Sequence, residues 1–219
     1  MASVSRADVI LFPALGKHCS LPASLFAFLI IMEHIRNFIE TMVTIDETDW
    51  QFFSSKLRRQ QYPKKTILLK EGKVENYLSF IEKGIIRFYI PKDANDITFV
   101  FAFENSFVSA YDSFLLQIPA HYNVETITET VLWRMTHKDL QDIYADTKFG
   151  NILGRLASEQ LFLINTKREY SFLNESAEQR YLNLFAEQPH LIKLMPLKYL
   201  ASYIGITPQA LSRIRRRIS

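Results

Sequence analysis

The C-terminal segment from Pro196 to Ser219 constrains the fold of this chain more than any other. It reads PLKYLASYIGITPQALSRIRRRIS and contains two short helical patterns separated by a glycine. In the first pattern the apolar residues recur at the spacing of one helix face: Leu197, Leu200, Ala201 and Ile204. In the second, the corresponding residues are Leu211, Ile214 and Ile218. The segment therefore predicts a helix-turn-helix.

The residues between the two patterns are suited to a tight turn. Gly205 stands where a helix end requires a positive φ, which glycine adopts most easily. Ile206 is expected to point into the small core, and Thr207 to cap a helix that begins at Pro208, where the missing N–H is not needed. Ala201 is small, as a close crossing of the two helices requires.

The second helix and its surroundings are strongly basic. Its polar face holds Gln209, Ser212, Arg213, Arg216 and Arg217. From His190 to Ser219 there are six Lys or Arg residues and no Asp or Glu, whereas residues 1–189 sum to about −3. A basic terminus on a mildly acidic body predicts an element that enters the major groove of DNA. The alternative is a solvated amphipathic helix hairpin with a basic tail.

Bulk composition excludes several other classes of protein. With 219 residues the chain can hold one large or two small domains. A single cysteine, Cys19, rules out an internal disulfide, a cysteine-ligated zinc site and a four-cysteine iron–sulfur cluster within one chain, and it favours a reducing, cytoplasmic location. The five histidines are scattered without a His-x-His pair, so a metal-dependent barrel enzyme is not expected. We predict no catalytic residue, metal or cofactor.

The N-terminal residues 1–31 form an extension ahead of a domain that is expected to begin near Met32. The apolar run from Leu25 to Met32 is too short to span a bilayer, and no small-x-small cleavage site follows it. Met32 is therefore a candidate for the true start of the native protein. The alternatives are a helical extension packed on the domain and a role in membrane attachment or export.

The middle of the chain predicts a small antiparallel barrel or roll flanked by helices. A helical pattern covers Phe38–Leu57, with Asp46 as a cap. Short strand patterns separated by turn residues then follow at Thr66–Leu69, Tyr77–Ile81, Ile85–Ile90, Ile97–Phe103, Tyr122–Ile127 and Val131–Met135. Thr136 and Asp139 read as a capping box that opens a short helix to Ala145.

A long helix is predicted from Lys148 to Phe172, followed by another from Glu175 to Glu187 and a break at Gln188-Pro189-His190. The apolar residues of the long helix cover about half of its circumference, which is more than one core requires. We expect it to pair with a second copy of the chain, since a helix-turn-helix usually reads DNA as a two-fold pair. The expected dimer contacts are Phe149, Ile152, Leu153, Leu156 and Leu163. The alternative is a single-core helix with a wide apolar face.

This arrangement resembles the Crp/Fnr family of bacterial transcription regulators over residues 33–219. The resemblance is carried by the helix-turn-helix and by Glu71-Gly72, Tyr77–Ile81 and Lys83–Arg87, in which two turn glycines flank an aromatic strand. It implies an α+β fold: a cyclic-nucleotide-binding-like β-roll of the double-stranded β-helix type at 32–146, a dimerisation helix at 147–173 and a DNA-binding domain at 174–219. The sequence ends at Ser219, so no wing is expected after the recognition helix.

The resemblance also implies which residues contact DNA. In members of the family, residues at the start and middle of the second helix contact the bases. Pro208 offers no side-chain hydrogen bond, so the base contacts are expected from Gln209 and Arg213. Gln suits adenine and Arg suits guanine. Phosphate contacts are expected from Lys198, Arg215, Arg216 and Arg217, and Thr207 and Ser212 complete the expected DNA-binding set. The expected partners are double-stranded DNA and a second copy, with RNA polymerase left open and no membrane.

The effector pocket departs from the family pattern. Members that respond to cyclic AMP use a Gly-Glu pair for the ribose and an Arg-Ser pair for the phosphate, whereas this chain has Ser109-Ala110 and His121-Tyr122 there. Without the arginine, an anionic phosphate would lose its hydration with little compensation, so cyclic AMP is not expected as the effector. The candidate pocket residues are Ser109, Ala110, Tyr111, His121, Tyr122 and Asn123. The alternative function is a ligand-binding or protein-interaction module that does not bind DNA.

Overall fold

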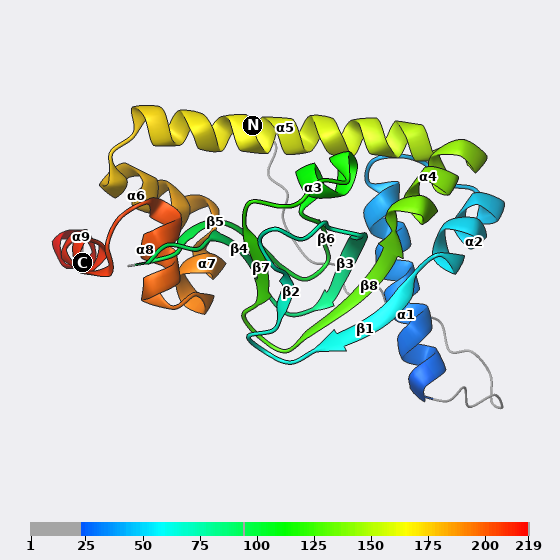
Figure 1. The fold of residues 1–219 in the computed structure, drawn as a ribbon, viewed down its shortest axis with the longest axis horizontal. Coiled ribbons are helices and arrows are strands. Elements are labelled where there is room, and N and C mark those ends of the chain that lie inside the picture. Colours follow the sequence, from blue (N-terminus) through cyan, green and yellow to red (C-terminus); the bar gives the residue numbers. More distant parts are fainter. Residues whose placement is uncertain (1–22, 94, 219) are drawn as a thin grey trace, which may run out of the picture.

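The computed structural model describes residues 23–93 and 95–218. An N-terminal helix pair, α1 (Ala23–Glu40) and α2 (Glu47–Ser55), packs beside a β-roll, and the long helix α5 extends from the roll to the C-terminal helices (Figure 1). Asp46 caps α2, as predicted, because its carboxylate accepts a hydrogen bond of 2.9 Å from the backbone N–H of Asp49.

The roll consists of two four-stranded antiparallel sheets, which confirms the predicted fold class. Their strand orders are β1-β8-β3-β6 and β2-β7-β4-β5. The strand bounds are β1 Arg58–Tyr62, β2 Ile67–Leu69, β3 Tyr77–Lys83, β4 Ile86–Ile90, β5 Ile97–Ala102, β6 Phe107–Val108, β7 Asn123–Thr126 and β8 Thr130–Thr136. The sequence did not predict β1, which is an exposed polar edge strand, or β6, which has two residues.

The turn glycine Gly84 is required by its surroundings. Its φ is +107°, and a Cβ built there would lie 2.5 Å from Thr130 Oγ1 and 2.6 Å from the carbonyl oxygen of Glu129. Gly72, the other glycine of the motif, has a φ of +81°. Both glycines therefore occupy turns that other residues adopt only with strain.

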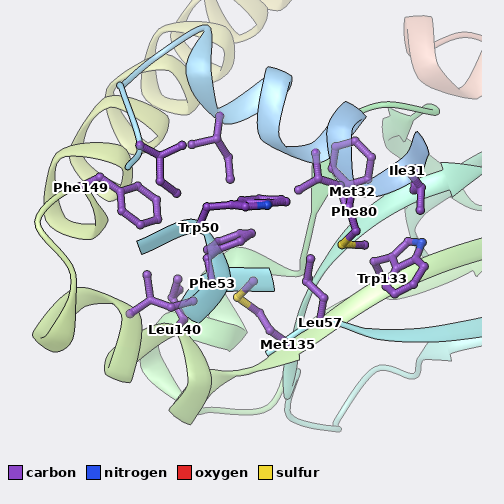
Figure 2. Close-up of a cluster of buried hydrophobic side chains, with 14 of the residues drawn as sticks. Ile31, Met32, Trp50, Phe53, Leu57, Phe80, Trp133, Met135, Leu140 and Phe149 are labelled. Atoms are coloured by element: carbon purple, nitrogen blue, oxygen red, sulfur yellow. The ribbon is translucent and has the colours of Figure 1, made fainter. Parts of the chain in front are cut away.

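The main core lies between the helices and the β1-β8-β3-β6 sheet (Figure 2). Trp50 and Phe53 of α2 stack on each other with ring centroids 5.9 Å apart. Phe149 also belongs to this core, since it is 2% exposed and its ring lies 6.0 Å from that of Phe53. The expectation that Phe149 contacts a second copy is therefore wrong, because the side chain is already buried within its own protomer.

Helix α1 crosses the expected domain boundary at Met32. Ile31 and Met32 are both 6% exposed in the main core, and the ring of Phe28 lies 5.5 Å from that of Trp133. Residues 23–31 are thus a helical extension packed on the roll, which is one of the alternatives that the sequence left open. The remainder of the predicted extension, residues 1–22, lies outside the described residues.

Two helices follow the roll. Helix α4 (His137–Asp146) begins with the predicted capping box: the Asp139 N–H donates to Thr136 Oγ1 at 3.1 Å, and the Thr136 N–H donates to Asp139 Oδ2 at 3.0 Å. Helix α5 runs from Gly150 to Asn174. The short helix α3 (Tyr111–Leu116), which the sequence did not predict, lies beneath α5 (Figure 1).

The C-terminal helices form a second core of their own. They are α6 (Ala177–Glu187), α7 (Pro189–Leu194), α8 (Leu197–Ile204) and α9 (Pro208–Ile218). The expected break at Gln188-Pro189-His190 is short, because Pro189 occupies the first position of α7, where its missing N–H is tolerated. Ile85 of the roll joins this second core, so the two halves of the molecule are packed together.

Candidate nucleic-acid interface

Helices α8 and α9 form the predicted helix-turn-helix. Gly205 has a φ of +85°, and its N–H donates to the carbonyl oxygens of Ala201 and Ser202, both at 3.0 Å. The N–H of Ile206 also reaches the Ala201 carbonyl at 3.0 Å. These bonds satisfy the last carbonyl groups of α8 and turn the chain sharply toward α9.

The start of α9 is capped by Thr207. Its hydroxyl accepts a hydrogen bond of 3.2 Å from the Ala210 N–H, and its carbonyl accepts one of 3.0 Å from the Leu211 N–H. Pro208 is the first residue of the helix. The predicted cap and first residue are therefore confirmed, and they fix the direction in which α9 leaves the turn.

The apolar residues of both helices are buried against each other. The exposed fractions of the side chains are 0% for Ala201 and Leu211 and 6% for Ile214. Ala201 lies at the predicted close crossing. Ile218, on the same face one turn later, is 41% exposed because the second core ends before it.

The outer face of the helix pair carries the predicted DNA-contacting residues. Gln209 and Arg213 are exposed on α9, and Ser212 is half-buried beside them. The other exposed members of the predicted set are Lys198, Thr207, Arg215, Arg216 and Arg217. Because Leu211 and Ile214 anchor the opposite side of α9, Gln209 and Arg213 are held facing outward.

Arg217 has a partner that the sequence did not indicate. Its Nη2 lies 2.7 Å from Glu178 Oε2 at the start of α6. Beside this pair, α6, the turn and α9 form a shallow, open hollow with a volume of about 650 Å³, which is lined by Ala177, Ile206, Ala210, Arg213, Ile214, Arg216 and Arg217. The basic side chains thus rim a hollow with an apolar floor.

Two further arginines donate hydrogen bonds to the last carbonyl groups of α8, just before the turn. Arg168 of α5 donates to the Tyr203 carbonyl at 3.0 Å, and Arg180 of α6 donates to the Ile204 carbonyl at 3.0 Å. Burial lowers the pKa of Arg168, whose guanidinium also lies over the Tyr203 ring at 4.0 Å. These cations cap the C-terminal end of α8, where the helix dipole favours positive charge.

The roll contains a small cavity of about 10 Å³, which is the size of a single water molecule. Of the predicted pocket residues, Ser109 and Ala110 line it. Ligand pockets for small molecules typically enclose about 300–1,000 Å³. In this conformation the cavity itself has no room for a nucleotide.

The other predicted pocket residues lie outside this cavity. The Tyr122 hydroxyl donates to Asp112, and burial raises the pKa of Tyr122. Asn123 accepts a hydrogen bond of 2.7 Å from the Glu71 N–H. His121 is exposed, and Tyr111 stacks on Phe114. The structure therefore does not bring the six predicted residues together.

Sequence reasoning missed an ion pair at the cavity. Arg134 of β8 and Glu75 are 8% and 6% exposed, with 3.7 Å between Arg134 Nη2 and Glu75 Oε1. Arg134 also donates to Ser79 Oγ at 3.1 Å and to the Tyr62 hydroxyl at 2.7 Å. Burial raises the pKa of Glu75 despite the nearby cation. An arginine flanked by apolar residues in the run Val131–Met135 is the one sequence signal that could have indicated this site.

The described residues were also searched for metal-binding clusters and for membrane-spanning helices. Within residues 23–93 and 95–218, no three His, Cys, Asp or Glu side chains lie close enough together to hold a metal ion. None of the helices that the structure describes combines the length and the apolar character needed to cross a membrane.

Comparison with known proteins matches the roll to a family and most of the chain to the fold of solved structures. Residues 59–147 match the model of the cyclic nucleotide-binding domain family. A CooA mutant from Carboxydothermus hydrogenoformans aligns with a TM-score of 0.61 at 13% identity, covering 75% of this chain and 77% of that one. No curated protein matches the chain.

Two further solved structures are similar. The c-di-GMP responsive global regulator CLP of Xanthomonas campestris aligns with a TM-score of 0.60 at 16% identity, covering 79% of this chain and 91% of that one. A transcriptional regulator of the Crp/Fnr family from Eubacterium rectale aligns with a TM-score of 0.59 at 17% identity, covering 80% and 83%. The predicted resemblance is therefore confirmed: the chain has the fold of the Crp/Fnr regulators, with a cyclic-nucleotide-binding-like roll.

Proposed function

We propose that this protein is a sequence-specific DNA-binding transcriptional regulator that acts as a homodimer in the cytoplasm and catalyses no reaction. The observation that carries the proposal is the helix pair α8–α9, whose capped turn and buried apolar face hold Gln209 and Arg213 outward on a basic surface. The similar proteins that are named as regulators support the same class of function.

In this proposal Gln209 reads adenine and Arg213 reads guanine in the major groove, each through two hydrogen bonds. Lys198, Arg215 and Arg216 contact phosphate groups, which adds affinity without sequence information. Arg217 also lies on this surface, and a phosphate that binds it must displace its 2.7 Å contact with Glu178.

The surface of α5 supports the homodimer. Toward its C-terminal half the helix exposes large apolar side chains on several sides, with exposed fractions of 68% for Phe162, 64% for Leu163 and 73% for Leu173. Patches of this kind mark interaction sites in soluble proteins. A second copy packed along α5 would cover them and would place two recognition helices as a two-fold pair. Ile152, 44% exposed, lies on the same helix, whereas Leu153 and Leu156 are half-buried.

Cyclic AMP does not serve as the effector in this proposal. The cavity of about 10 Å³ is far smaller than a nucleotide, and the arginine at its wall, Arg134, is engaged by Ser79, Tyr62 and Glu75. A nucleotide would have to displace these partners. Any effector of the roll would therefore be chemically different, and RNA polymerase remains a candidate partner of the DNA-bound dimer.

The test is fluorescence anisotropy with labelled fragments of the protein's own promoter region, in a series of salt concentrations. The wild type is expected to bind one fragment specifically, with an affinity that falls as salt rises. Arg213→Ala should cost about 1–3 kcal/mol, roughly a 5- to 150-fold loss, and relax base preference at one position. Arg155→Ala on α5 is the matched control, because Arg155 pairs with Glu159 away from α9.

Binding that is equally weak on every fragment, and unchanged by Arg213→Ala, would contradict the proposal. That result would favour the alternative, a ligand-binding or protein-interaction module of the same fold.

A further inference from the structure

The hollow between α6, the turn and α9 has an apolar floor. Ala177 of α6, Ile206 of the turn, and Ala210 and Ile214 of α9 form this floor. Ile214 is 6% exposed, and the other three residues are half-buried. Contacts to DNA phosphate groups are made by charged side chains and hydrogen-bond donors. The floor therefore offers an apolar surface that phosphate contacts leave unused.

The rim of the hollow is cationic along α9. Arg213, Arg216 and Arg217 stand at positions i, i+3 and i+4, so their side chains share one face of the helix. All three are exposed. Within residues 23–93 and 95–218, neither Arg213 nor Arg216 has a carboxylate at ion-pair distance. The rim thus carries more positive charge than the described side chains neutralise.

A carboxylate of the protein already lies at one end of this rim. Glu178 Oε2 is 2.7 Å from Arg217 Nη2, so a carboxylate fits between α6 and α9. Ala177, which lines the hollow, is the first residue of α6, a helix of 11 residues. The N-terminal end of a helix favours negative charge. The hollow therefore suits an anionic group beside the arginines.

The size and openness of the hollow limit the shape of a ligand. Its volume of about 650 Å³ falls in the range of about 300–1,000 Å³ that is typical of small-molecule sites. Because the hollow is shallow and open, a ligand would lie along the floor with one side in water. An alkyl chain can cover an apolar surface in this way while its charged head group stays hydrated, as the stem of a lysine does.

We propose that this hollow binds a free, single-chain amphiphilic anion, such as a medium-chain carboxylate. The head group contacts Arg213 and Arg216, and the alkyl chain covers Ala177, Ile206 and Ala210. Binding of the anion is independent of the proposed function, whereas its effect on DNA binding rests on it. Because Arg213 cannot hold the anion and a base at the same time, the anion and the DNA site exclude each other.

Isothermal titration calorimetry of the full-length protein without DNA tests the site. The probes are hexanoate, octanoate and decanoate, each below its critical micelle concentration. Affinity should rise severalfold at each step of this series, because each added CH₂ group buries apolar area on the floor. Octanol, which lacks the charge, should bind severalfold more weakly than octanoate. Equal affinities along the series, or for octanol and octanoate, would overturn the site.

A matched pair of substitutions locates the alkyl chain. Ala177→Leu fills part of the floor and should weaken decanoate binding severalfold. Ala157→Leu is the control, because Ala157 is exposed on α5 and does not line the hollow. Equal decanoate affinities in these two variants would overturn the proposed position of the chain.

A second pair locates the head group. Arg216→Gln removes a cation from the rim and should weaken decanoate binding severalfold. Arg155→Gln on α5 should leave it unchanged, because Arg155 pairs with Glu159 away from α9. Glu178→Gln frees Arg217 and should strengthen binding. Equal affinities in the two arginine variants would overturn the role of the rim.

Thermal midpoints distinguish a bound ligand from a denaturing detergent or a membrane surface. A ligand that binds only the folded state raises the midpoint. Decanoate should therefore raise it in the wild type and have a smaller effect in Ala177→Leu, and a fall in both proteins would overturn the site. Cosedimentation with phosphatidylglycerol vesicles, without binding of monomeric decanoate, would also overturn it.

DNA anisotropy in the presence of decanoate separates the two proposals. Decanoate should raise the apparent Kd for the specific fragment severalfold in the wild type. The effect should be much smaller in Ala177→Leu, whose arginines are intact. Unaltered DNA affinity in saturating decanoate would overturn the mutual exclusion. Decanoate binding by a wild type that binds no DNA specifically would support the site and overturn the proposed function.

Discussion

Arginine has opposite environments in the roll and on α9. In the roll, Arg87 and Arg134 are 2% and 8% exposed, and each is held by a carboxylate and by aromatic rings. On α9, Arg213 and Arg216 are exposed around a hollow with an apolar floor. A buried arginine stabilises the structure only while its partners stay in place, whereas an exposed one keeps its hydrogen-bond donors available to a ligand.

Removal of one arginine of each kind is expected to give the largest difference in stability. Arg134→Met leaves Glu75 buried without its cation and should lower the free energy of unfolding by about 3–5 kcal/mol. Arg213→Met should change it by less than about 0.5 kcal/mol, since the side chain is exposed. Urea denaturation at pH 7 measures both. Similar losses for the two variants would contradict the distinction.

The next largest effect is expected at the turn between α8 and α9. Gly205→Ala places a Cβ at a φ of +85° and 2.8 Å from Cε1 of Phe172, so it should destabilise the protein by roughly 1–3 kcal/mol and misplace α9. Gly72→Ala is the matched control, because Gly72 also has a positive φ of +81° but no atom within 4 Å of the added Cβ. Calorimetry should show the larger fall in midpoint for Gly205→Ala, and DNA affinity should fall for that variant alone.

The buried pair of Arg134 and Glu75 also predicts that the stability of the protein depends on pH, whereas the exposed arginines of α9 predict no such dependence. Because burial raises the pKa of Glu75 above its usual 4.5, the folded state holds a proton that the unfolded state has already released. Stability from this group is present below about pH 4.5 and is lost as pH rises through the folded-state pKa. Glu75→Gln keeps an acceptor for the Asn76 and Tyr77 N–H groups and should remove this loss.

Thermal midpoints from pH 4 to 8 measure that effect. The Glu75→Gln variant should gain stability relative to the wild type as pH rises. Parallel curves of thermal midpoint against pH for the two proteins would contradict the raised pKa of Glu75. Asp142→Asn is the control that should show no such gain over this range, because the Lys138 and Lys56 side chains lower the pKa of Asp142 below its usual 3.8 on the surface of α4.

The smallest effect concerns the pair between Arg217 and Glu178. Glu178→Gln removes the carboxylate that lies 2.7 Å from Arg217, so Arg217 becomes available to phosphate. An exposed pair of this kind contributes about 0–1 kcal/mol, so stability should barely change. Specific DNA affinity should rise severalfold, with the salt slope steeper by about one. Glu159→Gln, which breaks the Arg155 pair on α5, should leave both quantities unchanged.

Local patterns explain which elements were predictable. The Thr136 capping box, the Asp46 cap, Gly205 and Thr207 each act within about four residues, so the sequence shows them directly. The edge strand Arg58–Tyr62 was not predictable from its pattern, because its side chains are mostly exposed and polar.

The assignment of apolar residues to one core or another required the tertiary structure. The helical pattern identified Phe149 as apolar, yet only packing shows that it completes the core around Phe53 and not a dimer contact. Ile31 and Met32 are a second example. The sequence placed a domain boundary beside them, whereas the structure shows both residues on helix α1 and buried in the main core.

The helix-turn-helix, the antiparallel roll and the basic C-terminal surface could be predicted from the sequence, because periodicity, caps and charge are properties of neighbouring residues. The tertiary structure decided which charged side chains are buried together. Arg134 meets Glu75, and Ser202 meets Asp96, across 59 and 106 positions of the chain. Such contacts depend on how sheets and helices pack, and no local pattern encodes that packing. The helix-turn-helix was therefore visible in the sequence, whereas its contacts with the roll were not.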